Sequence, residues 1–421
     1  MYESLRGKKL LVIGSEETDN YLVRTAQSMG VYVIAVDGKK TSDKTVAKKT
    51  ADESWDIDYQ NVDTIVKKCK ESRVDGVIAG YSENRVLAAC RIANVLGLPF
   101  YATEEQINKT RNKRVFKEIC SQNNVPVPRE YCITGFPTKE EITAVPLPVI
   151  IKPADSAGRK GITICYTSDE IEPAIKRALK ESYSQTIVME EYIIGKEFAA
   201  IYTLQDGYYS LSYFNEKYLN PVLSKSGICD FSMSPSRYLG GFLTTCDKPI
   251  RQMMKSIGIT NGVAFFQGIV NESGYWIFEM GYRLNGANDC EQIERINHIN
   301  YAKMIIAHSL TGIMEGIIKN DNPDFSAYSG VLTLYAKGGK INQINYSGDP
   351  TILKAEMYHS PGSIIQSDSS TQQRVFRFKI LTSTINQMQQ LIQYAQNHVQ
   401  VLDSDNRDML LSTFDPQRIE T

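Results

Sequence analysis

Short apolar runs alternate with amphipathic stretches along the first hundred residues. Apolar runs at residues 8–14, 31–37, 74–79 and 98–101 predict four buried strands. Helical periodicity over residues 19–29, closed by Gly30, and in the stretch that ends at Val95 predicts helices between them. This alternation is typical of a doubly wound domain, so we expect a parallel α/β sheet of four strands over residues 1–105.

The pattern changes after residue 105. A helix expected at residues 110–121 ends before Pro126 and Pro128, since proline cannot continue a helix. Beyond it we expect a strand, a glycine loop and a second strand over residues 146–166, followed by a helix at 170–181 and strands at 186–192, 196–203 and 208–214. This succession predicts an antiparallel α+β domain spanning residues 106–315.

The last hundred residues predict a third, C-terminal α+β domain, residues 316–421. We expect a hairpin over residues 329–346 that turns at Gly338-Gly339, then a strand at 374–381, a helix at 385–397 and a strand at 399–401. No long linker separates the three domains, so we expect them to pack together.

Composition narrows the range of functions. The 421 residues are 42% hydrophobic and 23% charged and carry a net charge of -1, which favours a globular, cytoplasmic protein without nucleic-acid or membrane partners. The eight cysteines show no Cys-x-x-Cys spacing, and the four histidines accompany no Gly-x-Ser-x-Gly motif. A zinc site, a redox pair and a serine hydrolase are therefore not expected.

The segment from Gln267 to Arg283 predicts a hairpin that could hold a metal ion. A three-residue loop, 272–274, would place Asn271 opposite Tyr275, Val270 opposite Trp276 and Gln267 opposite Glu279. Side chains alternate along a strand, so Glu279, Gly281 and Arg283 would share one face with Gln267. Mg²⁺ binds oxygen ligands and substrate phosphates, and a neighbouring arginine can stabilise a transferring group. The alternative is an exposed hairpin with a chance charge pair.

A second candidate site follows the apolar strand that ends at Lys152. The loop Pro-Ala-Asp-Ser156-Ala-Gly158-Arg-Lys-Gly161 could place backbone N–H groups over phosphates, which Lys152 would reach from the strand end. It is not a Walker A loop, because Gly-Lys-Ser/Thr is absent and a strand follows. A hairpin with a mobile tip is the alternative.

A third segment, residues 188–198, contains two strands around a turn at Gly195. Its backbone could bind a purine through one carbonyl and one N–H, and its carboxylates could bind amine or ribose donors. The residues concerned are Glu190, Glu191, Ile193 and Glu197. Paired acidic residues are more often a solvated face.

Taken together, these motifs resemble the ATP-grasp superfamily, in particular the branch of biotin carboxylase, carbamoyl phosphate synthetase and carboxylate-amine ligases. The resemblance includes Asn112-Lys113, the glycine loop, Met189-Glu190-Glu191-Tyr192-Ile193 and Glu279-x-x-x-Arg283. It implies an N-terminal pre-ATP-grasp domain, an ATP-grasp domain whose glycine loop and adenine strand lie within residues 113–205, and a C-terminal cap.

The resemblance also implies roles for individual residues. Lys113 and Lys152 would contact ATP phosphates, and the backbone of residues 191–193 would bind adenine, with Glu190 beside its amine and Glu197 near the ribose. Gln267 and Glu279 would bind Mg²⁺, for which Mn²⁺ could substitute, and Arg283 would support the acyl-phosphate step. Substrate contacts are expected from Lys217, Tyr218, Arg237 and Asn285. A homodimer is compatible with the resemblance.

Two positions depart from the family pattern. Glycine occupies position 281, where the family has asparagine, so one oxygen ligand is missing unless Asn285, another residue or water replaces it. Gln267 stands where a carboxylate is usual, which keeps an oxygen ligand but weakens the attraction for Mg²⁺.

The expected function is therefore ATP-dependent ligation, in which a carboxylate becomes an acyl-phosphate and an amine or similar nucleophile displaces phosphate. Two alternatives remain open. One is a catalytically weakened ATP-binding or regulatory protein, motivated by Gly281. The other is a bicarbonate-activating, carboxylating enzyme.

Overall fold

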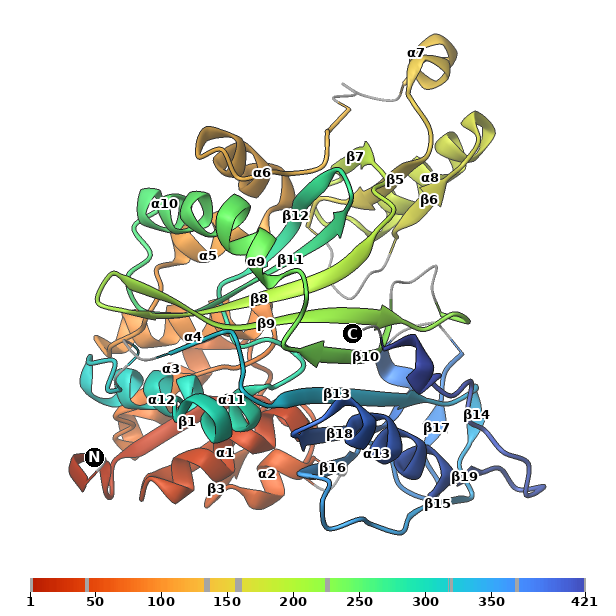
Figure 1. Ribbon diagram of the computed structural model, residues 1–421. Coiled ribbons are helices and arrows are strands. Elements are labelled where there is room, and N and C mark those ends of the chain that lie inside the picture. The colour runs from red at the N-terminus through yellow and green to blue at the C-terminus, as the bar shows by residue number, and fades with distance from the viewer. Residues whose placement is uncertain are drawn as a thin grey trace.

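The computed structural model describes residues 3–41, 45–131, 137–155, 161–223, 228–316, 318, 321–367 and 371–419. Figure 1 shows an N-terminal α/β part at the lower left, a small three-stranded sheet at the upper right, and a long sheet that runs through the middle into the C-terminal part. The predicted combination of α/β and α+β architecture is confirmed. Within the described ranges, no helix is long and apolar enough to cross a membrane.

The N-terminal sheet is parallel throughout, with the strand order β3-β2-β1-β4. Its strands are β1 (Lys9–Ile13), β2 (Tyr32–Val36), β3 (Glu53–Trp55) and β4 (Gly76–Ile78). Every residue of β4, and every residue of β1 and β2 after the first, is buried, as expected of strands covered on both faces. The main helices are α1 (Glu17–Ser28), α3 (Val62–Ser72) and α4 (Glu83–Leu96), and the short α2 spans Val46–Thr50.

The prediction of a fourth strand at residues 98–101 is wrong. This segment is irregular, and β3 completes the sheet instead. Pro99 has no N–H to donate to a strand ladder, and Tyr101 packs edge-on against Tyr282, with their ring centroids 5.2 Å apart. The three-residue β3 is too short and too polar to give a recognisable pattern.

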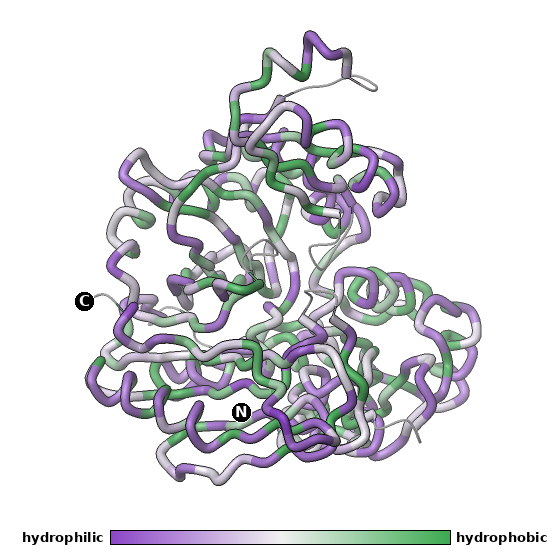
Figure 2. The backbone as a smooth tube through the Cα atoms, turned by 90° about the vertical axis from the view of Figure 1, so that its right-hand side faces the viewer, coloured by the Kyte–Doolittle hydropathy of each residue, from purple (hydrophilic) through white to green (hydrophobic). Residues whose placement is uncertain are grey.

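The three-stranded unit consists of β5 (Val149–Pro153), β6 (Thr163–Cys165), β7 (Ile187–Glu191) and the helix α8 (Ile171–Glu181). β5 lies in the middle and pairs antiparallel with both neighbours. The unit has its own hydrophobic core, in which Ile151, Ile171 and Ile175 are almost fully buried. It lies above the rest of the molecule in both views, with the short helix α7 (Lys139–Ala144) at its outer end (Figures 1 and 2).

A single eight-stranded sheet joins the middle and the C-terminal parts of the chain, in the order β12-β11-β8-β9-β10-β13-β18-β16. The first five strands in this order are β12 (Gly274–Gly281), β11 (Gly262–Asn271), β8 (Lys196–Gln205), β9 (Tyr208–Leu219) and β10 (Cys229–Ser234). The last three belong to the C-terminal cap: β13 (Tyr328–Tyr335), β18 (Arg374–Thr382) and β16 (Lys354–Met357). All seven pairings are antiparallel.

The remaining helices connect these sheets. They are α5 (Glu104–Arg111), α6 (Lys113–Gln122), α9 (Leu239–Phe242), α10 (Lys248–Ser256), α11 (Cys290–Asn297), α12 (Tyr301–Thr311) and α13 (Ile385–Asn397). The single helix predicted at residues 110–121 is thus two, because the Asn112 side chain caps α6 by accepting hydrogen bonds from the N–H groups of Arg114 and Val115. One continuous hydrophobic core extends from the N-terminal sheet to β8, β11 and α12, while the cap has a core of its own.

The hairpin predicted at residues 329–346 is wrong. β13 pairs with β10 and β18, while β14 (Gly339–Lys340) pairs with β17 (Ile364–Ile365) and β15 (Gln343–Tyr346) pairs with β19 (Val399–Leu402). All of β13 after its first residue is buried, so it needs partners on both sides. The predicted helix at residues 385–397 is confirmed.

Candidate active site

The hairpin β11–β12 places the predicted oxygen ligands side by side, although its turn differs from the prediction. The loop contains two residues rather than three, so Asn271 pairs with Gly274, Val270 with Tyr275 and Ile269 with Trp276. A β-bulge follows, in which Gly268 pairs with Ile277 and Gln267 with Glu279. The extra residue, Phe278, compensates for the shorter loop and restores the predicted Gln267–Glu279 pair.

These two side chains line a pocket of about 310 Å³ on one face of the eight-stranded sheet. The pocket also contains Arg283, Glu197, Lys217 and Asn285, so six of the predicted site residues meet here. The cap adds two cations that the sequence did not single out, Arg374 and Arg377, both on β18. The pocket therefore combines side-chain oxygen ligands with three guanidinium groups.

The guanidinium of Arg283 is held by the N-terminal domain. Its Nη2 donates to the carboxylate of Glu83 over 3.2 Å, and its Nη1 donates to the carbonyl of Leu284 over 2.9 Å. Its Nε is buried and has no hydrogen-bond partner among the described residues. One N–H of this fixed group is thus left unsatisfied by the described part of the protein.

Gly281 provides no side chain to the site, and the ring of Phe265 occupies the space beside it. A Cβ atom at position 281 would lie less than 3.0 Å from Cε1 of Phe265, its cross-strand partner. The Arg283 guanidinium stacks on the same ring, 4.9 Å from its centroid. The position where the family has asparagine is therefore filled by an aromatic ring that supports Arg283.

Asn285 is oriented by a buried carboxylate. Its Nδ2 donates to Asp289 Oδ2 over 2.6 Å, and burial raises the pKa of Asp289. Its Oδ1 has no partner among the described residues, although the side chain is only 8% exposed. A hydrogen-bond acceptor is therefore fixed in the pocket wall.

The loop that carries Asn285 is anchored by the cap. Arg377 Nη1 donates to the Gly286 carbonyl over 2.8 Å, and Lys379 Nζ donates to the Asn288 carbonyl over 2.7 Å. The Nε atoms of Arg374 and Arg377 are buried and have no partner within the part of the chain that the structure describes. The cap thus shapes the pocket wall, and each of its two arginines there keeps a buried N–H without a partner among the described residues.

In the three-stranded unit, Lys152 and Lys117 both pair with the carboxylate of Glu190. All three side chains are buried, and the two ammonium groups leave an excess of one positive charge. Burial lowers the pKa of Lys117 to about 8. Burial, together with the charges of Lys117 and Lys113, lowers the pKa of Lys152 well below its usual value, while Glu279 on the opposite hairpin acts to raise it.

The two predicted phosphate-binding lysines lie near the hairpin and near the start of the glycine loop. The Lys152 ammonium lies 6.0 Å from the ring centroid of Phe278, the bulged residue, and the backbone N–H of Lys113 donates to the carbonyl of Ala154 over 3.2 Å. Gly161 has a φ of +73°, which favours glycine at this end of the loop. Ser156 and Gly158 lie outside the described residues.

The predicted adenine segment connects the three-stranded unit to the long sheet. The N–H groups of Glu191 and Tyr192 donate to the carbonyls of Arg129 and Pro148, over 2.9 and 3.1 Å. Ile193 is buried, and Glu197 pairs with Lys217 on β9. The N–H groups of residues 191 and 192 are therefore already engaged, and a purine would need the carbonyl of Glu191 or the N–H of Ile193.

Two predicted substrate residues lie elsewhere. Tyr218 and Arg237 line an adjoining cavity that extends to Tyr275 and Arg418 and does not contain Gln267, Glu279 or Arg283. Tyr218 follows Lys217 on β9, so its side chain points to the opposite face of the sheet. The structure thus separates Tyr218 and Arg237 from Asn285, while Lys217 lies in the walls of both cavities.

The chain resembles known ligases and carboxylases over most of its length. The family described as D-ala D-ala ligase C-terminus matches residues 134–221. Biotin carboxylase 1 of Bacillus subtilis is 24% identical over 393 residues, which cover 86% of this chain and 82% of the relative. The large chain of carbamoyl phosphate synthase from Methanosphaerula palustris is 26% identical over 45% of this chain, a match that spans only 19% of that protein.

Solved structures agree with these matches. An L-amino acid ligase from Bacillus licheniformis superposes with a TM-score of 0.78 at 15% identity, over 94% of this chain and 99% of that one. The biotin carboxylase domain of the Hydrogenobacter thermophilus 2-oxoglutarate carboxylase, in complex with MgADP, ADP and bicarbonate, also gives a TM-score of 0.78, at 19% identity and with 94% and 90% coverage. The chain therefore shares the fold of ATP-grasp proteins and resembles ATP-grasp ligases and carboxylases in sequence.

The donor set of this chain suits a metal ion that binds together with a nucleotide. Gln267 and Glu279 present oxygens from adjacent strands. In the described ranges, no group of three or more His, Cys, Asp or Glu side chains could hold a metal ion. Mg²⁺ needs six oxygen ligands and readily accepts phosphate and water among them, so these two residues fit Mg²⁺ only in company with phosphates.

Proposed function

We propose that this protein is an ATP-dependent ligase that activates a carboxylate as an acyl-phosphate and joins it to an amine, with release of ADP and phosphate. The observation that carries the proposal is the composition of one pocket. Gln267, Glu279, Arg283, Arg374 and Arg377 all line it, and Glu279 is close enough to Lys152 to act on the pKa of that lysine. Candidate metal ligands and guanidinium groups that could bind a carboxylate thus share a single cavity, with a candidate phosphate-binding lysine nearby.

The lysines would position the nucleotide. The buried excess of positive charge at Lys117, Lys152 and Glu190 favours an anion, and phosphates entering between this cluster and Glu279 would supply it. Mg²⁺, held by Gln267, Glu279 and phosphate oxygens, would neutralise part of the phosphate charge. Arg283, held by Glu83 and stacked on Phe265, would stabilise the charge on the transferring phosphoryl group.

The far end of the pocket would hold the acid and the amine. Arginine binds carboxylates through several parallel N–H groups, and Arg374 and Arg377 each have an unpartnered Nε there. Asn285 Oδ1, fixed by Asp289, can accept a hydrogen bond from an amino group. Donors for a carboxylate and an acceptor for an amine together suit amino acids. The structural likeness to an L-amino acid ligase supports that choice of substrate class.

A second candidate is a nucleotide-binding protein with weakened catalysis. The observation in its favour is Phe265, which fills the space beside Gly281 and leaves the site with fewer oxygen ligands. Bicarbonate is an alternative acid, as one similar domain was solved with bicarbonate, MgADP and ADP.

The decisive experiment measures the release of ADP and phosphate from MgATP. The protein would be assayed with single amino acids, with pairs of amino acids and with bicarbonate. The Glu279→Gln variant would be assayed in parallel as the inactive control. Turnover that requires both an acid and an amine, and that yields an amide detected by mass spectrometry, supports ligation. If MgADP binds but no mixture gives turnover, the weakened-catalysis candidate is correct.

A further inference from the structure

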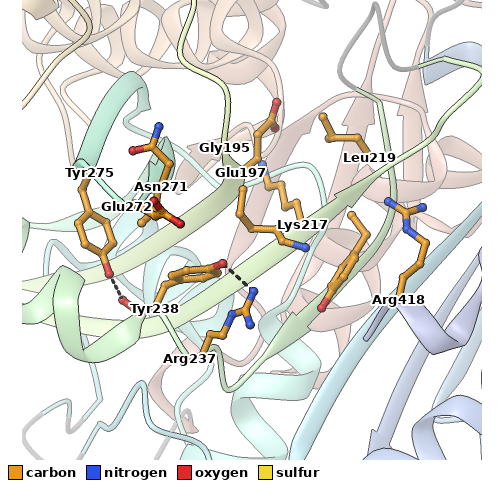
Figure 3. A pocket seen from close by; sticks show the side chains of 13 residues that line it. Gly195, Glu197, Lys217, Leu219, Arg237, Tyr238, Asn271, Glu272, Tyr275 and Arg418 are labelled. Carbon is orange, nitrogen blue, oxygen red and sulfur yellow. Dashed lines mark hydrogen bonds between the residues drawn. The ribbon is translucent and has the colours of Figure 1, made fainter. Parts of the chain in front are cut away.

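A second cavity, of about 620 Å³, lies beside the catalytic pocket. Figure 3 shows its walls, which come from four parts of the chain: the start of β8, the end of β9, the tip of the β11–β12 hairpin and the segment before α9. Arg418 closes it from the C-terminal tail. The two cavities share Glu197 and Lys217.

This back-face cavity opens on the side of the sheet opposite Gln267 and Glu279. Glu197 pairs with Lys217 and faces the catalytic pocket, so the next residues along, Lys196 and Tyr218, face the other way. Their contact confirms this direction, because Lys196 Nζ lies 3.8 Å from the centroid of the Tyr218 ring. The catalytic pocket and the back-face cavity are therefore separated by a single layer of backbone.

The back-face cavity carries excess positive charge. Among the residues that the structure describes, four basic side chains, Lys196, Lys217, Arg237 and Arg418, line it with two acidic ones, Glu197 and Glu272. The guanidinium of Arg418 lies 6.0 Å from the Tyr218 ring centroid, and that of Arg237 lies 4.9 Å from the ring centroid of Tyr238. A ligand with two negative charges would balance this excess.

Hydrogen bonds hold the aromatic walls in place. Tyr275 donates its hydroxyl to the carbonyl of Tyr238 over 2.8 Å, and Arg237 Nη2 donates to the hydroxyl of Tyr238 over 2.8 Å. Tyr218 is 1% exposed and donates to the buried carboxylate of Glu216 over 2.5 Å. Tyr218 is therefore a buried support, whereas the half-buried Tyr238 and Tyr275, held beside the guanidinium of Arg237, form a preorganised surface for a planar anion.

The back-face cavity also touches the connection between the three-stranded unit and the long sheet. Gly195 lies in its wall, and a Cβ there would lie less than 3.0 Å from the carbonyl oxygen of Val270. Asn271, another wall residue, donates from Nδ2 to the carbonyl of Ile194 over 2.8 Å. A ligand in this cavity would therefore contact the segment that joins the predicted nucleotide-binding unit to the long sheet.

We propose that the back-face cavity binds a small, ring-bearing dianion, an aromatic phosphate monoester or dicarboxylate, and that the bound anion restrains the connection at residues 192–196. Lys196, Arg237 and Arg418 would bind the charged end, and Tyr238 and Tyr275 would contact the ring. This site is separate from the acid, amine and nucleotide sites proposed above.

The test measures binding of phenyl phosphate and of isophthalate to the full chain by calorimetry, at constant ionic strength and with saturating MgADP present. The variants are Arg418→Gln and Lys196→Gln, and the control is Arg407→Gln, an exposed arginine of the cap paired with Asp405. Hydrogen exchange at residues 192–196 provides an independent readout, and MgADP affinity is measured for every variant.

We expect at least one probe to bind beside MgADP, with affinity reduced about tenfold or more in Arg418→Gln and Lys196→Gln and unchanged in Arg407→Gln. The probe that binds more tightly identifies the anion as phosphate or carboxylate. We also expect slower exchange at residues 192–196 when it is bound. Probe binding that MgADP abolishes, that both cavity variants retain, or that neither probe shows would overturn the proposal, whereas loss of ligase turnover alone would not affect it.

Discussion

The ring of Phe265 lies in the space that a side chain at position 281 would need. The two residues are cross-strand partners on β11 and β12, and Phe265 is 5% exposed. Gly281 and Phe265 are therefore sterically coupled, so the effect of a substitution at one position depends on the residue at the other.

Gly281→Asn alone should not restore the family's metal ligand. Forcing a side chain against the Phe265 ring is overpacking, so we expect it to lower the free energy of unfolding by about 1–3 kcal/mol. Gly281→Asn combined with Phe265→Ala removes the clash, and thermal unfolding should show the double variant to be more stable than the sum of the two single changes predicts. Simple additivity would mean that the ring does not block position 281.

Removing the carboxylate of Glu279 should remove metal-dependent turnover and leave the fold intact. Glutamine keeps the shape but loses the charge, so we expect Glu279→Gln to reduce ADP release at least tenfold, with a melting temperature within ~2 °C of the parent. Glu172→Gln, which changes an exposed residue of α8, is the matched control. Normal turnover in Glu279→Gln would remove this residue from the proposed metal site.

Nucleotide binding should take up protons at pH 8 to 9. Burial lowers the pKa of Lys117 to about 8 and that of Lys152 well below its usual value, so part of this lysine pair is neutral in the free protein at that pH. Phosphates nearby would favour the charged forms and raise both pKa values. Calorimetry of MgADP binding in HEPES and in Tris measures the uptake.

Lys117→Met should reduce this proton uptake, whereas Lys109→Met, which changes a lysine on α5 paired with Glu105, should not. Equal uptake in the parent and the Lys117→Met variant would show that Lys117 does not sense the phosphates.

Glu356 should make the cap sensitive to acid. Burial acts to raise the pKa of Glu356, but Lys379, Arg377 and Lys354 and a hydrogen bond from Tyr358 outweigh it, and the pKa falls to about 2. A lowered carboxyl pKa stabilises the fold above pH 4.5, and this stabilisation, about 3 kcal/mol, is lost as the pH falls from 4.5 towards 2. Glu356→Gln should therefore be less stable than the parent at pH 7, and the difference should shrink below pH 4.5 in denaturant titrations.

Hydrophobic patterns along the chain predicted the positions of helices and strands better than they predicted which strands pair. The buried strands β1, β2 and β4 and the helix α13 followed from hydrophobic periodicity. The pairing of β13 with β10 and β18 could not be predicted, because a strand buried on both faces carries no signal for which distant strand it joins. β3, with three residues, was too short to detect.

The candidate active site shows the same difference between local features, which were predicted, and long-range contacts, which were not. The pairing of Gln267 with Glu279 was predicted from a loop one residue too long, and the bulge at Phe278 compensated for the error. Arg374 and Arg377 were missed because they reach the pocket through the pairing of β18 with β13, which connects segments that are distant in sequence. The burial of Lys117 beside Glu190 likewise depends on the contact of α6 with the three-stranded unit.

The unbroken sheet from β12 to β16 determines which parts of this protein could be exchanged with those of a relative. The three-stranded unit has a self-contained core, so it could be replaced as a block. The cap supplies three strands of the shared sheet, and cutting it away would leave β10 as an unpaired edge prone to aggregation. Chimeras that exchange the three-stranded unit should therefore alter nucleotide binding, whereas a change of the acid or the amine requires β10 and the cap to be exchanged together.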